Sequence, residues 1–530
     1  MEGLALTEAR LAREKARGLW PGRVITDYLD QWVDQKPDAT ALVAWRVEDE
    51  AETRLTWRQL AHRAAAAACT LEDAGVGPGD VVSFQLPNWW ELVALYLATV
   101  RLGAVANPLM PIFRRRELSF MLRLAESRVL ITPERFRGFD HGALARELAA
   151  ELPGMKVLGL DFGSPSEAFL RGARLRPDDV TQLLYTSGTT GESKGVLHTS
   201  NTLLSAVAVF PRHLRLGARD VIFMPSPLAH QLGFMYGMLM SLVLGVPIVL
   251  LDLWRAARAA QLIQENNATF AFAATPFLAD LVEGNAKLPT LRVFASAGAP
   301  IPPAVVQAAH DRLGLAVAAS WGMTECGSVT CTPHDGSRTA ESDGCALPNG
   351  EVRVVGADGR EAPSGTIGAL QVRGASLFVG YLKRPALYRL DEEGWFDTGD
   401  LARMDAEGYL RICGRSKDVI IRGGENIPVV EIEAALYRMP QVADAAVVAM
   451  PDPRLQERAC AYVTLRARQS LSLAQLTQHL AQEGFSKHFW PERLEVLAEM
   501  PRTPTGKIQK FVLRELAKAL SAVQRPVLLQ

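Results

Sequence analysis

The stretch "YTSGTTGESKG" (residues 185–195) is rich in glycine, serine and threonine and carries a lysine next to its last glycine. A glycine-rich backbone exposes N–H groups that can surround phosphate oxygens, and the lysine adds positive charge. The strand-like run "VTQLLYT" (180–186) precedes the loop, and the helix-like run "SNTLLSAVAVF" (200–210) follows it. We therefore expect this stretch to bind phosphate, with a flexible turn as the alternative.

The loop is not the common P-loop of nucleotide triphosphatases, whose pattern is G-x-x-x-x-G-K-[ST]. Counted from Gly188, the residue before Lys194 is Ser193 instead of glycine. Gly195 then stands where the pattern needs a hydroxyl for magnesium. The pattern fails at two positions, so another phosphate-binding family has to be considered.

Three more motifs follow the loop: "WGMTE" (321–325), "GWFDTGDLARMDAEGYLRICGRSKDVIIRGGENI" (394–427) and "PRTPTGKIQK" (501–510). In this order and at this spacing, the four motifs resemble the signature motifs of adenylate-forming enzymes. That superfamily includes acyl-CoA synthetases, aryl-CoA ligases, luciferases and the adenylation domains of peptide synthetases. The resemblance covers about residues 20–515. The segment "PLAHQLGFMYG" (227–237) makes the chain look most like short/medium-chain or alicyclic (cyclohexanecarboxylate-type) acyl-CoA ligases.

The resemblance implies a two-step reaction that uses ATP, Mg²⁺ and coenzyme A. A carboxylate first attacks the α-phosphate of ATP, which gives an acyl-adenylate and pyrophosphate, and a thiol then displaces AMP. Both steps concentrate negative charge, so catalysis rests on positioning and electrostatic stabilisation. An acyl-AMP ligase that loads a separate acyl carrier protein is the closest alternative. A luciferase-type oxidation and a non-catalytic ligand sensor are more distant ones.

The resemblance also implies which residues hold ATP and magnesium. The residues expected at the β- and γ-phosphates are Thr186, Ser187, Gly188, Thr189, Thr190, Gly191 and Lys194. The residues expected around adenine and the acyl group are Ser320, Trp321, Gly322, Met323 and Thr324, with Ala297, Gly298 and Ala299 as the opposite wall. Glu325 stands at the position of the family's magnesium ligand, and a lone carboxylate suits Mg²⁺ because this ion keeps water ligands and bridges phosphates. A helix cap or a surface acid is the alternative for Glu325.

The residues expected to act in catalysis are Lys507, His230, Thr186 and Glu325. By resemblance, Lys507 bridges the carboxylate and the α-phosphate, where a long cationic side chain can stabilise developing charge. His230 matches an aromatic or histidine gate near the carboxylate, and the alternative is a hydrogen-bonded core histidine. Further along, Asp400 is expected to accept hydrogen bonds from the ribose hydroxyls, and Arg415 to reach ribose or phosphate.

In the family, a small C-terminal domain rotates about a hinge between the two steps. We expect residues 1–414 to form the domain that binds ATP and acid, and residues 415–530 to form a mobile domain that carries the catalytic lysine. Lys417 in "GRSKD" matches the hinge position, although many relatives have aspartate there. Gly423 and Gly424 are expected to line the pantetheine tunnel, because glycine lets backbone approach a ligand closely.

The alternation of helical and strand-like runs over the first 400 residues predicts an α/β fold with helix-covered parallel sheets. The segment 351–374 alternates and contains turn pairs, which predicts a barrel-like antiparallel piece. After about residue 415 the pattern predicts a small α+β domain. The uncharged run 231–251 is long enough to span a bilayer, but Gly245 and Pro247 interrupt it. A buried helix, a turn and a buried strand fit that run better.

The amino-acid composition indicates which binding partners and which cellular compartment to expect. The 530 residues carry a net charge of −1, so no nucleic-acid partner is expected. The six cysteines include no CxxC pair, and the charged N-terminus does not read as a secretory signal. Both observations favour a reducing compartment, and we expect a cytoplasmic protein.

The acid substrate is expected to lack an amino group, because residues 227–251 contain no acidic side chain to pair with a buried ammonium. The apolar residues expected to face it are Leu232, Gly233, Phe234, Met235 and Tyr236. They favour a ring or a short branched chain, although a methionine-rich helix is also ordinary core. Since no carrier domain follows Gln530, coenzyme A is the expected acceptor.

Overall fold

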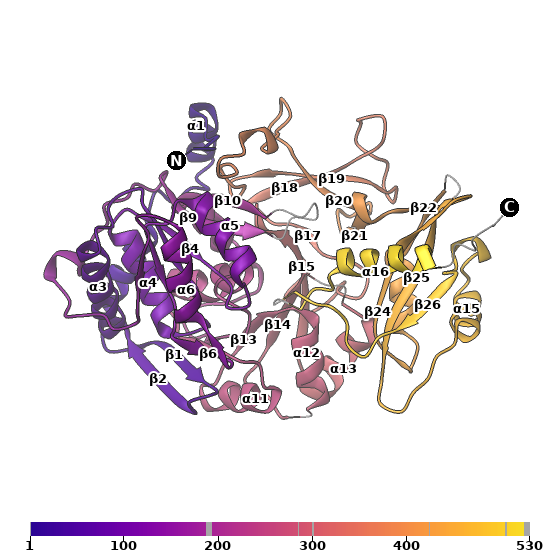
Figure 1. The fold of residues 1–530 in the computed structure, drawn as a ribbon, viewed down its shortest axis with the longest axis horizontal. Coiled ribbons are helices and arrows are strands. Elements are labelled where there is room, and N and C mark those ends of the chain that lie inside the picture. Colours follow the sequence, from indigo (N-terminus) through magenta and orange to yellow (C-terminus); the bar gives the residue numbers. More distant parts are fainter. Residues whose placement is uncertain are drawn as a thin grey trace.

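Two large sheets, an antiparallel meander and a C-terminal sheet make up the fold, which Figure 1 shows as a ribbon coloured from indigo to yellow along the chain. The protein is seen in a computed structural model. It describes residues 2–186, 193–284, 286–298, 301–422, 425–503 and 506–523.

The larger sheet has nine strands in the order β17-β16-β15-β14-β13-β11-β12-β1-β2. Its strands are β1 (Thr40–Arg46), β2 (Ala51–Thr56), β11 (Ile222–Met224), β12 (Ile248–Leu251), β13 (Phe270–Ala273), β14 (Val293–Ala297), β15 (Ala316–Met323), β16 (Gly327–Cys331) and β17 (Cys345–Ala346). Strands β1, β12, β11, β13, β14 and β15 pair in parallel, while β2, β16 and β17 add antiparallel edges. Parallel neighbours need crossover connections, which explains the helices between them.

The second sheet has six strands in the order β10-β9-β4-β3-β5-β8. Its strands are β3 (Val81–Phe84), β4 (Val105–Pro108), β5 (Val129–Ile131), β8 (Lys156–Leu158), β9 (Val180–Thr186) and β10 (Lys194–Thr199). All pairs are parallel except β9 with β10, which are antiparallel and flank residues 187–192. A short hairpin, β6 (Arg135–Phe136) with β7 (Phe139–Asp140), stands apart from both sheets. The β9/β10 pair therefore delivers both ends of the predicted phosphate loop.

Helices cover these sheets and pack against them in several hydrophobic clusters. The helices of this part are α1 (Glu8–Ala16), α2 (Ile25–Gln35), α3 (Trp57–Asp73), α4 (Trp90–Arg101), α5 (Arg115–Ala125), α6 (His141–Glu151), η1 (Glu167–Phe169), α7 (Ser200–Ala208), α8 (Phe210–His213), α11 (Ala256–Glu265), α12 (Thr275–Glu283) and α13 (Pro303–Leu313). The main hydrophobic cluster joins side chains of α3 and α4 to both sheets. The alanine run 64–68 of α3 is fully buried, and such small side chains let two helices pack closely.

The uncharged run 231–251 folds as expected into buried helix, turn and strand. It forms α9 (Gln231–Gly233), the π-helix η2 (Phe234–Leu239) and α10 (Met240–Leu244) before β12. Gly245 ends α10 in the left-handed region, with φ 66°. A Cβ at this position would lie 2.4 Å from the Trp32 ring, so the turn requires glycine. Among the residues described, no helix combines the length and apolar character needed to cross a bilayer.

The last third of the chain forms two smaller units. The antiparallel meander consists of β18 (Gly350–Val355), β19 (Gly368–Gly374), β20 (Phe396–Met404) and β21 (Leu410–Arg415), with the short helix η3 (Pro385–Leu387). The C-terminal unit consists of η4 (Ser416–Asp418), β22 (Ile420–Arg422), β23 (Glu425–Ile427), α14 (Val429–Tyr437), β24 (Val442–Asp452), β25 (Gln456–Leu465), α15 (Leu473–Gln482), η5 (Lys487–Phe489), β26 (Arg493–Val496) and α16 (Lys510–Val523). It has its own hydrophobic cores. The fold class is thus the expected one, a large α/β N-terminal part with a small α+β C-terminal domain, which lies on the right in Figure 1.

Candidate active site

The two ends of the glycine-rich loop face each other across the β9/β10 pair. Thr186, the last residue of β9, is the register partner of Lys194, the first residue of β10. The Thr186 hydroxyl is buried and has no hydrogen-bond partner in the part of the chain that the structure describes. Five predicted phosphate ligands, Ser187, Gly188, Thr189, Thr190 and Gly191, lie outside the described residues. The β9/β10 pair therefore places the Thr186 hydroxyl and the Lys194 side chain at the two ends of the predicted phosphate loop.

The motif "WGMTE" forms the end of β15 and the turn into β16. Gly322 packs so closely on this turn that a Cβ would lie 2.1 Å from the carbonyl oxygen of Gly327. Glu325 is 3% exposed. Its Oε1 accepts a hydrogen bond from the Tyr381 hydroxyl at 2.7 Å, and Lys194 Nζ lies 3.9 Å from the same oxygen. The loop lysine and the predicted magnesium ligand are therefore neighbours.

A buried histidine supports the same turn. His198 of β10 donates from Nε2 to the carbonyl oxygen of Thr324 at 2.8 Å, and its Nδ1 lies 3.0 Å from the Thr202 hydroxyl. Burial lowers the pKa of His198 from 6.5 to about 4. The ring is therefore neutral at physiological pH and fixes the backbone next to Glu325.

A second acid joins Trp321 to the start of the C-terminal unit. Trp321 Nε1 donates to Asp400 Oδ2 at 2.9 Å, and Arg415 Nε lies 3.0 Å from Asp400 Oδ1. Burial raises the pKa of Asp400 above its usual value, and Arg415 and Trp321 oppose that effect. The predicted adenine and ribose residues thus share one buried centre.

Lys507 reaches this centre from the C-terminal domain. A Cβ added to Gly298 would lie 2.6 Å from Lys507 Cε, and Gly298 has a φ of +85°. Burial lowers the pKa of Lys507, with a further decrease from Arg415, while Asp400 and Glu325 act in the opposite direction. A residue near the end of the chain is therefore brought among Gly298, Asp400 and Glu325.

His230 lies close enough to Lys507 to feel its positive charge. It caps α9, since its Nδ1 accepts the N–H of Leu232 at 3.2 Å. Burial, followed by the positive charge of Lys507, lowers the pKa of His230 to about 3. The ring is neutral, and its electrostatic coupling to Lys507 places it near the reacting groups.

The residues expected to line the acyl pocket are packed tightly in this structure. Phe234, Met235 and Tyr236 are all buried. The Tyr236 hydroxyl accepts the N–H of Ser328 at 2.6 Å, and the rings of Phe234 and Tyr96 lie 4.6 Å apart. These three side chains belong to the main core, and Leu232 packs against it while remaining partly exposed.

The hinge region forms the short helix η4, where Ser416 Oγ donates to Gly399 O at 3.1 Å and Asp418 pairs with Arg514. The Lys417 side chain is not among the described groups, and Ala299, Gly423 and Gly424 also lie outside the described residues.

The comparisons with known proteins agree with this geometry. Residues 29–382 match the AMP-binding enzyme family, and residues 431–507 match the AMP-binding enzyme C-terminal domain. The chain belongs to the AMP-binding enzyme family. This is the adenylate-forming superfamily that the four motifs indicated, and its acyl-CoA ligases use ATP, Mg²⁺ and CoA.

Relatives and solved structures match almost the full chain. The medium-chain fatty-acid–CoA ligase of Escherichia coli (strain K12) is 35% identical over 97% of this chain and 94% of that protein. A salicylyl-CoA synthase / salicylate adenylyltransferase of Streptomyces sp is 32% identical over 96% of each chain. The anthranilate CoA ligase AuaEII, solved with anthranoyl-AMP, superposes with a TM-score of 0.85 at 26% identity, covering 94% of this chain and 98% of that one.

The family's magnesium chemistry fits the residues present. Among the described residues, no group of three or more histidine, cysteine, aspartate or glutamate side chains could enclose a metal. A single buried carboxylate beside a lysine suits Mg²⁺ held mainly by phosphates and water. The Thr186 hydroxyl, which has no hydrogen-bond partner among the described residues, adds a donor that fits a phosphate oxygen.

Sequence reasoning missed Tyr381 and His198, which hold the Glu325 turn. Tyr381 is 187 residues away from Lys194 in the chain, and His198 is 126 residues away from Thr324. Their contacts depend on strand pairing, which the sequence pattern does not reveal. The available signal was the placement of His198 inside a short apolar strand.

Proposed function

We propose that this chain joins an apolar or aryl carboxylic acid to coenzyme A at the expense of ATP, as an AMP-forming acyl-CoA synthetase. The observation that carries the proposal is that Lys194 lies 3.9 Å from the buried Glu325, while Lys507 lies beside Gly298 and is close enough to Glu325 for that carboxylate to influence its pKa. Positive groups on both sides of the phosphates fit a reaction that builds negative charge on them.

In the first step, a carboxylate oxygen attacks the α-phosphorus and the bond to the β-phosphate breaks, which releases pyrophosphate. Lys507 stabilises charge on the α-phosphate and the incoming carboxylate. Lys194 and Thr186 hold the departing phosphates, and Asp400 with Arg415 orients the ribose. Glu325 would hold Mg²⁺, which when bound would supply positive charge against the phosphates. Neutral His230 forms an uncharged wall beside the carboxylate.

In the second step, the CoA thiol attacks the acyl carbonyl, loses its proton, and AMP leaves with the original carboxylate oxygen. We place the domain boundary at residues 414/415, within one residue of the end of β21 at Arg415, after which η4 leads into a separate sheet. Rotation about Lys417 would withdraw Lys507 and bring Gly423 and Gly424 to the thiol channel. Such element ends are common hinges.

The substrate class follows from charge and from the relatives. No acidic residue lies between 227 and 251, so a substrate ammonium would find no partner in this segment. The relatives named for medium-chain fatty acids and for salicylate support an apolar chain or an aromatic ring. The six cysteines are free, which supports a cytoplasmic location.

Mass spectrometry of the products tests the function. The protein is incubated with ATP, Mg²⁺ and a panel of fatty, alicyclic and aryl acids, with and without CoA. We expect AMP, pyrophosphate and acyl-CoA. Acyl-AMP that accumulates and resists CoA would instead favour the alternative in which a carrier protein is the acceptor, and ADP with phosphate would contradict the proposal.

A further inference from the structure

Tyr381 lies on a segment that joins β10 to the Glu325 turn. In this segment Val379 N–H donates to Leu197 O of β10 at 2.9 Å, and Phe378 N–H donates to Glu325 O at 2.6 Å. Tyr381 itself is 1% exposed. Its position is therefore fixed by backbone hydrogen bonds on both sides.

The Tyr381 hydroxyl stands between the two charged groups of the phosphate side. It donates to Glu325 Oε1 at 2.7 Å and accepts from Lys194 Nζ at 3.2 Å. Lys194 Nζ also lies 4.6 Å from the centre of the Tyr381 ring. Burial and the neighbouring Glu325 raise the pKa of Tyr381 well above its usual value, so the hydroxyl keeps its proton.

Without the Tyr381 hydroxyl, the Lys194 ammonium and the Glu325 carboxylate could contact each other directly. Lys194 Nζ is already only 3.9 Å from Glu325 Oε1, and an ammonium and a carboxylate attract each other at so short a distance. A carboxylate that is paired with lysine competes less well for Mg²⁺, and a paired lysine competes less well for phosphate. Partners that orient a ligating carboxylate commonly matter for metal affinity.

We propose that Tyr381 is a positioning residue for magnesium, which holds Glu325 ready for the ion and keeps it from collapsing onto Lys194. This inference rests on the proposed function, in which Glu325 binds magnesium and Lys194 binds phosphate. Tyr381 acts through these two side chains and not on the reacting atoms.

The ring and the hydroxyl of Tyr381 can be separated experimentally. The ring packs against Phe378 at 4.6 Å, and Tyr381→Phe keeps that contact. Tyr388 is a matched control, because its ring lies 4.9 Å from Phe378 and its hydroxyl contacts Arg10 and Phe378 O instead of Glu325. We expect both variants to melt within about 5 °C of the wild type.

The test measures metal binding without turnover. Mn²⁺ is titrated in the presence of a non-hydrolysable ATP analogue, and free Mn²⁺ is followed by electron paramagnetic resonance. We expect Tyr381→Phe to raise the Kd for Mn²⁺ about tenfold, while Tyr388→Phe stays within about twofold of the wild type. An unchanged Kd in folded Tyr381→Phe would overturn the proposal.

A double-mutant cycle tests whether Tyr381 acts through Glu325. In the Glu325→Gln background, Tyr381→Phe should add less than about twofold to the Kd. The same tenfold increase in both backgrounds would contradict a positioning role. Product analysis of the wild type keeps the two proposals apart: a wild type that forms no acyl-adenylate refutes the function, whereas an active wild type with Mn²⁺ binding indifferent to Tyr381→Phe refutes only this inference.

Discussion

The residues proposed to hold phosphate and magnesium, Lys194 and Glu325, are fixed in the structure in a different way from the proposed catalytic lysine, Lys507. Glu325 lies in the turn between the paired strands β15 and β16, and Lys194 begins β10, which pairs with β9. The Tyr381 hydroxyl contacts both side chains. Lys507 lies on a loop that is closed by hydrogen bonds within the loop itself. Thr503 N–H donates to Lys507 O at 2.7 Å, and Lys507 N–H donates to Thr503 Oγ1 at 3.0 Å. On the proposed mechanism, the groups that bind phosphate are built around the sheets, while the lysine needed for adenylation is carried on the C-terminal unit.

Removing the lysine should produce the largest difference between the two half-reactions. Lys507→Ala is expected to slow acyl-adenylate formation about a thousandfold, because a positioned cation at the reacting phosphate is lost. Formation of acyl-CoA from supplied acyl-adenylate should stay within about threefold of the wild type. Rapid-quench assays of each half-reaction measure both rates.

Lys518→Ala is the matched control for that experiment, since Lys518 is exposed on α16 of the same domain. It should leave both half-reactions unchanged. An equal loss of both steps in Lys507→Ala would contradict a lysine that serves adenylation alone.

Changing Glu325 should instead alter how the rate of adenylation depends on the magnesium concentration. Glu325→Gln keeps the size of the side chain but removes its charge, and we expect the Mg²⁺ concentration for half-maximal adenylation to rise at least about tenfold. Steady-state rates over a magnesium series measure it, with the exposed Glu361→Gln as control. A wild-type magnesium curve would refute the ligand role of Glu325.

Stiffening the proposed hinge at Lys417, between the N-terminal part and the C-terminal domain, should slow only the thiol step. Lys417 lies inside the short helix Ser416–Asp418, where proline would fix φ and restrict the conformation of the preceding residue. Lys417→Pro is expected to slow the thiol step about tenfold and to leave adenylation within about twofold. An unaffected thiol step would move the hinge away from Lys417.

The buried His198 beside the Glu325 turn should make the stability of the folded protein depend on pH. The pKa of His198 is about 4 in the folded protein and 6.5 in its ordinary state, so the unfolded chain binds the extra proton between these values. Stability is therefore complete above pH 6.5 and decreases as the pH falls toward 4, by up to about 3 kcal/mol. We expect His198→Gln to lose less melting temperature between pH 7 and pH 5 than the wild type. The exposed His310→Gln should behave as the wild type, and parallel curves for His198→Gln would contradict the assignment.

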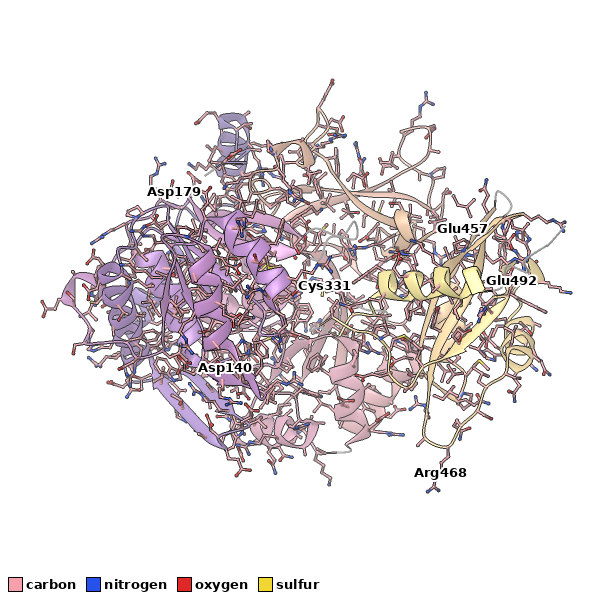
Figure 2. All side chains as sticks on the ribbon, in the orientation of Figure 1. Asp140, Asp179, Cys331, Glu457, Arg468 and Glu492 are labelled. Carbon is pink, nitrogen blue, oxygen red and sulfur yellow. The ribbon has the colours of Figure 1, made fainter. Side chains whose placement is uncertain are left out.

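The smallest effect is expected at the contact between the two parts. Arg466 pairs with Glu283 of α12 at 3.4 Å, and both side chains are more than half exposed. Exposed pairs of this kind contribute about 0–1 kcal/mol. Arg466→Ala should change the ratio of the two half-reaction rates by less than about threefold at low salt and not at all at high salt. Arg468, which points into solvent in Figure 2, provides the control Arg468→Ala, and a large salt-independent effect of Arg466→Ala would show a tighter contact than this one.

The sequence predicted the fold class and the site motifs because both depend on local patterns. Gly245 and Pro247 marked the turn between helix and strand. The motif residues Lys194 and Glu325 lie 3.9 Å apart, and Asp400 and Glu325 both influence the pKa of Lys507. The π-helix Phe234–Leu239 could not be predicted, because a uniformly apolar run contains no periodicity to read.

Long-range partners also escaped prediction. Tyr381 joins the site through an isolated bridge to Val196, and a sequence pattern does not show which distant segments will pair. The expectation that Phe234, Met235 and Tyr236 face the acyl group remains a prediction, since these side chains are packed in the core. Strand order had the same limit, because apolar periodicity does not fix which strands are neighbours.

Isotope transfer tests the central claim most directly. An accepted acid labelled with ¹⁸O in both carboxylate positions is incubated with the protein, ATP, Mg²⁺ and CoA, and the products are weighed by mass spectrometry. The account predicts one ¹⁸O in AMP, one in acyl-CoA and none in pyrophosphate, because the carboxylate attacks the α-phosphorus and the thiol later breaks the carbon–oxygen bond. Label in inorganic phosphate, with ADP as the nucleotide product, would contradict it.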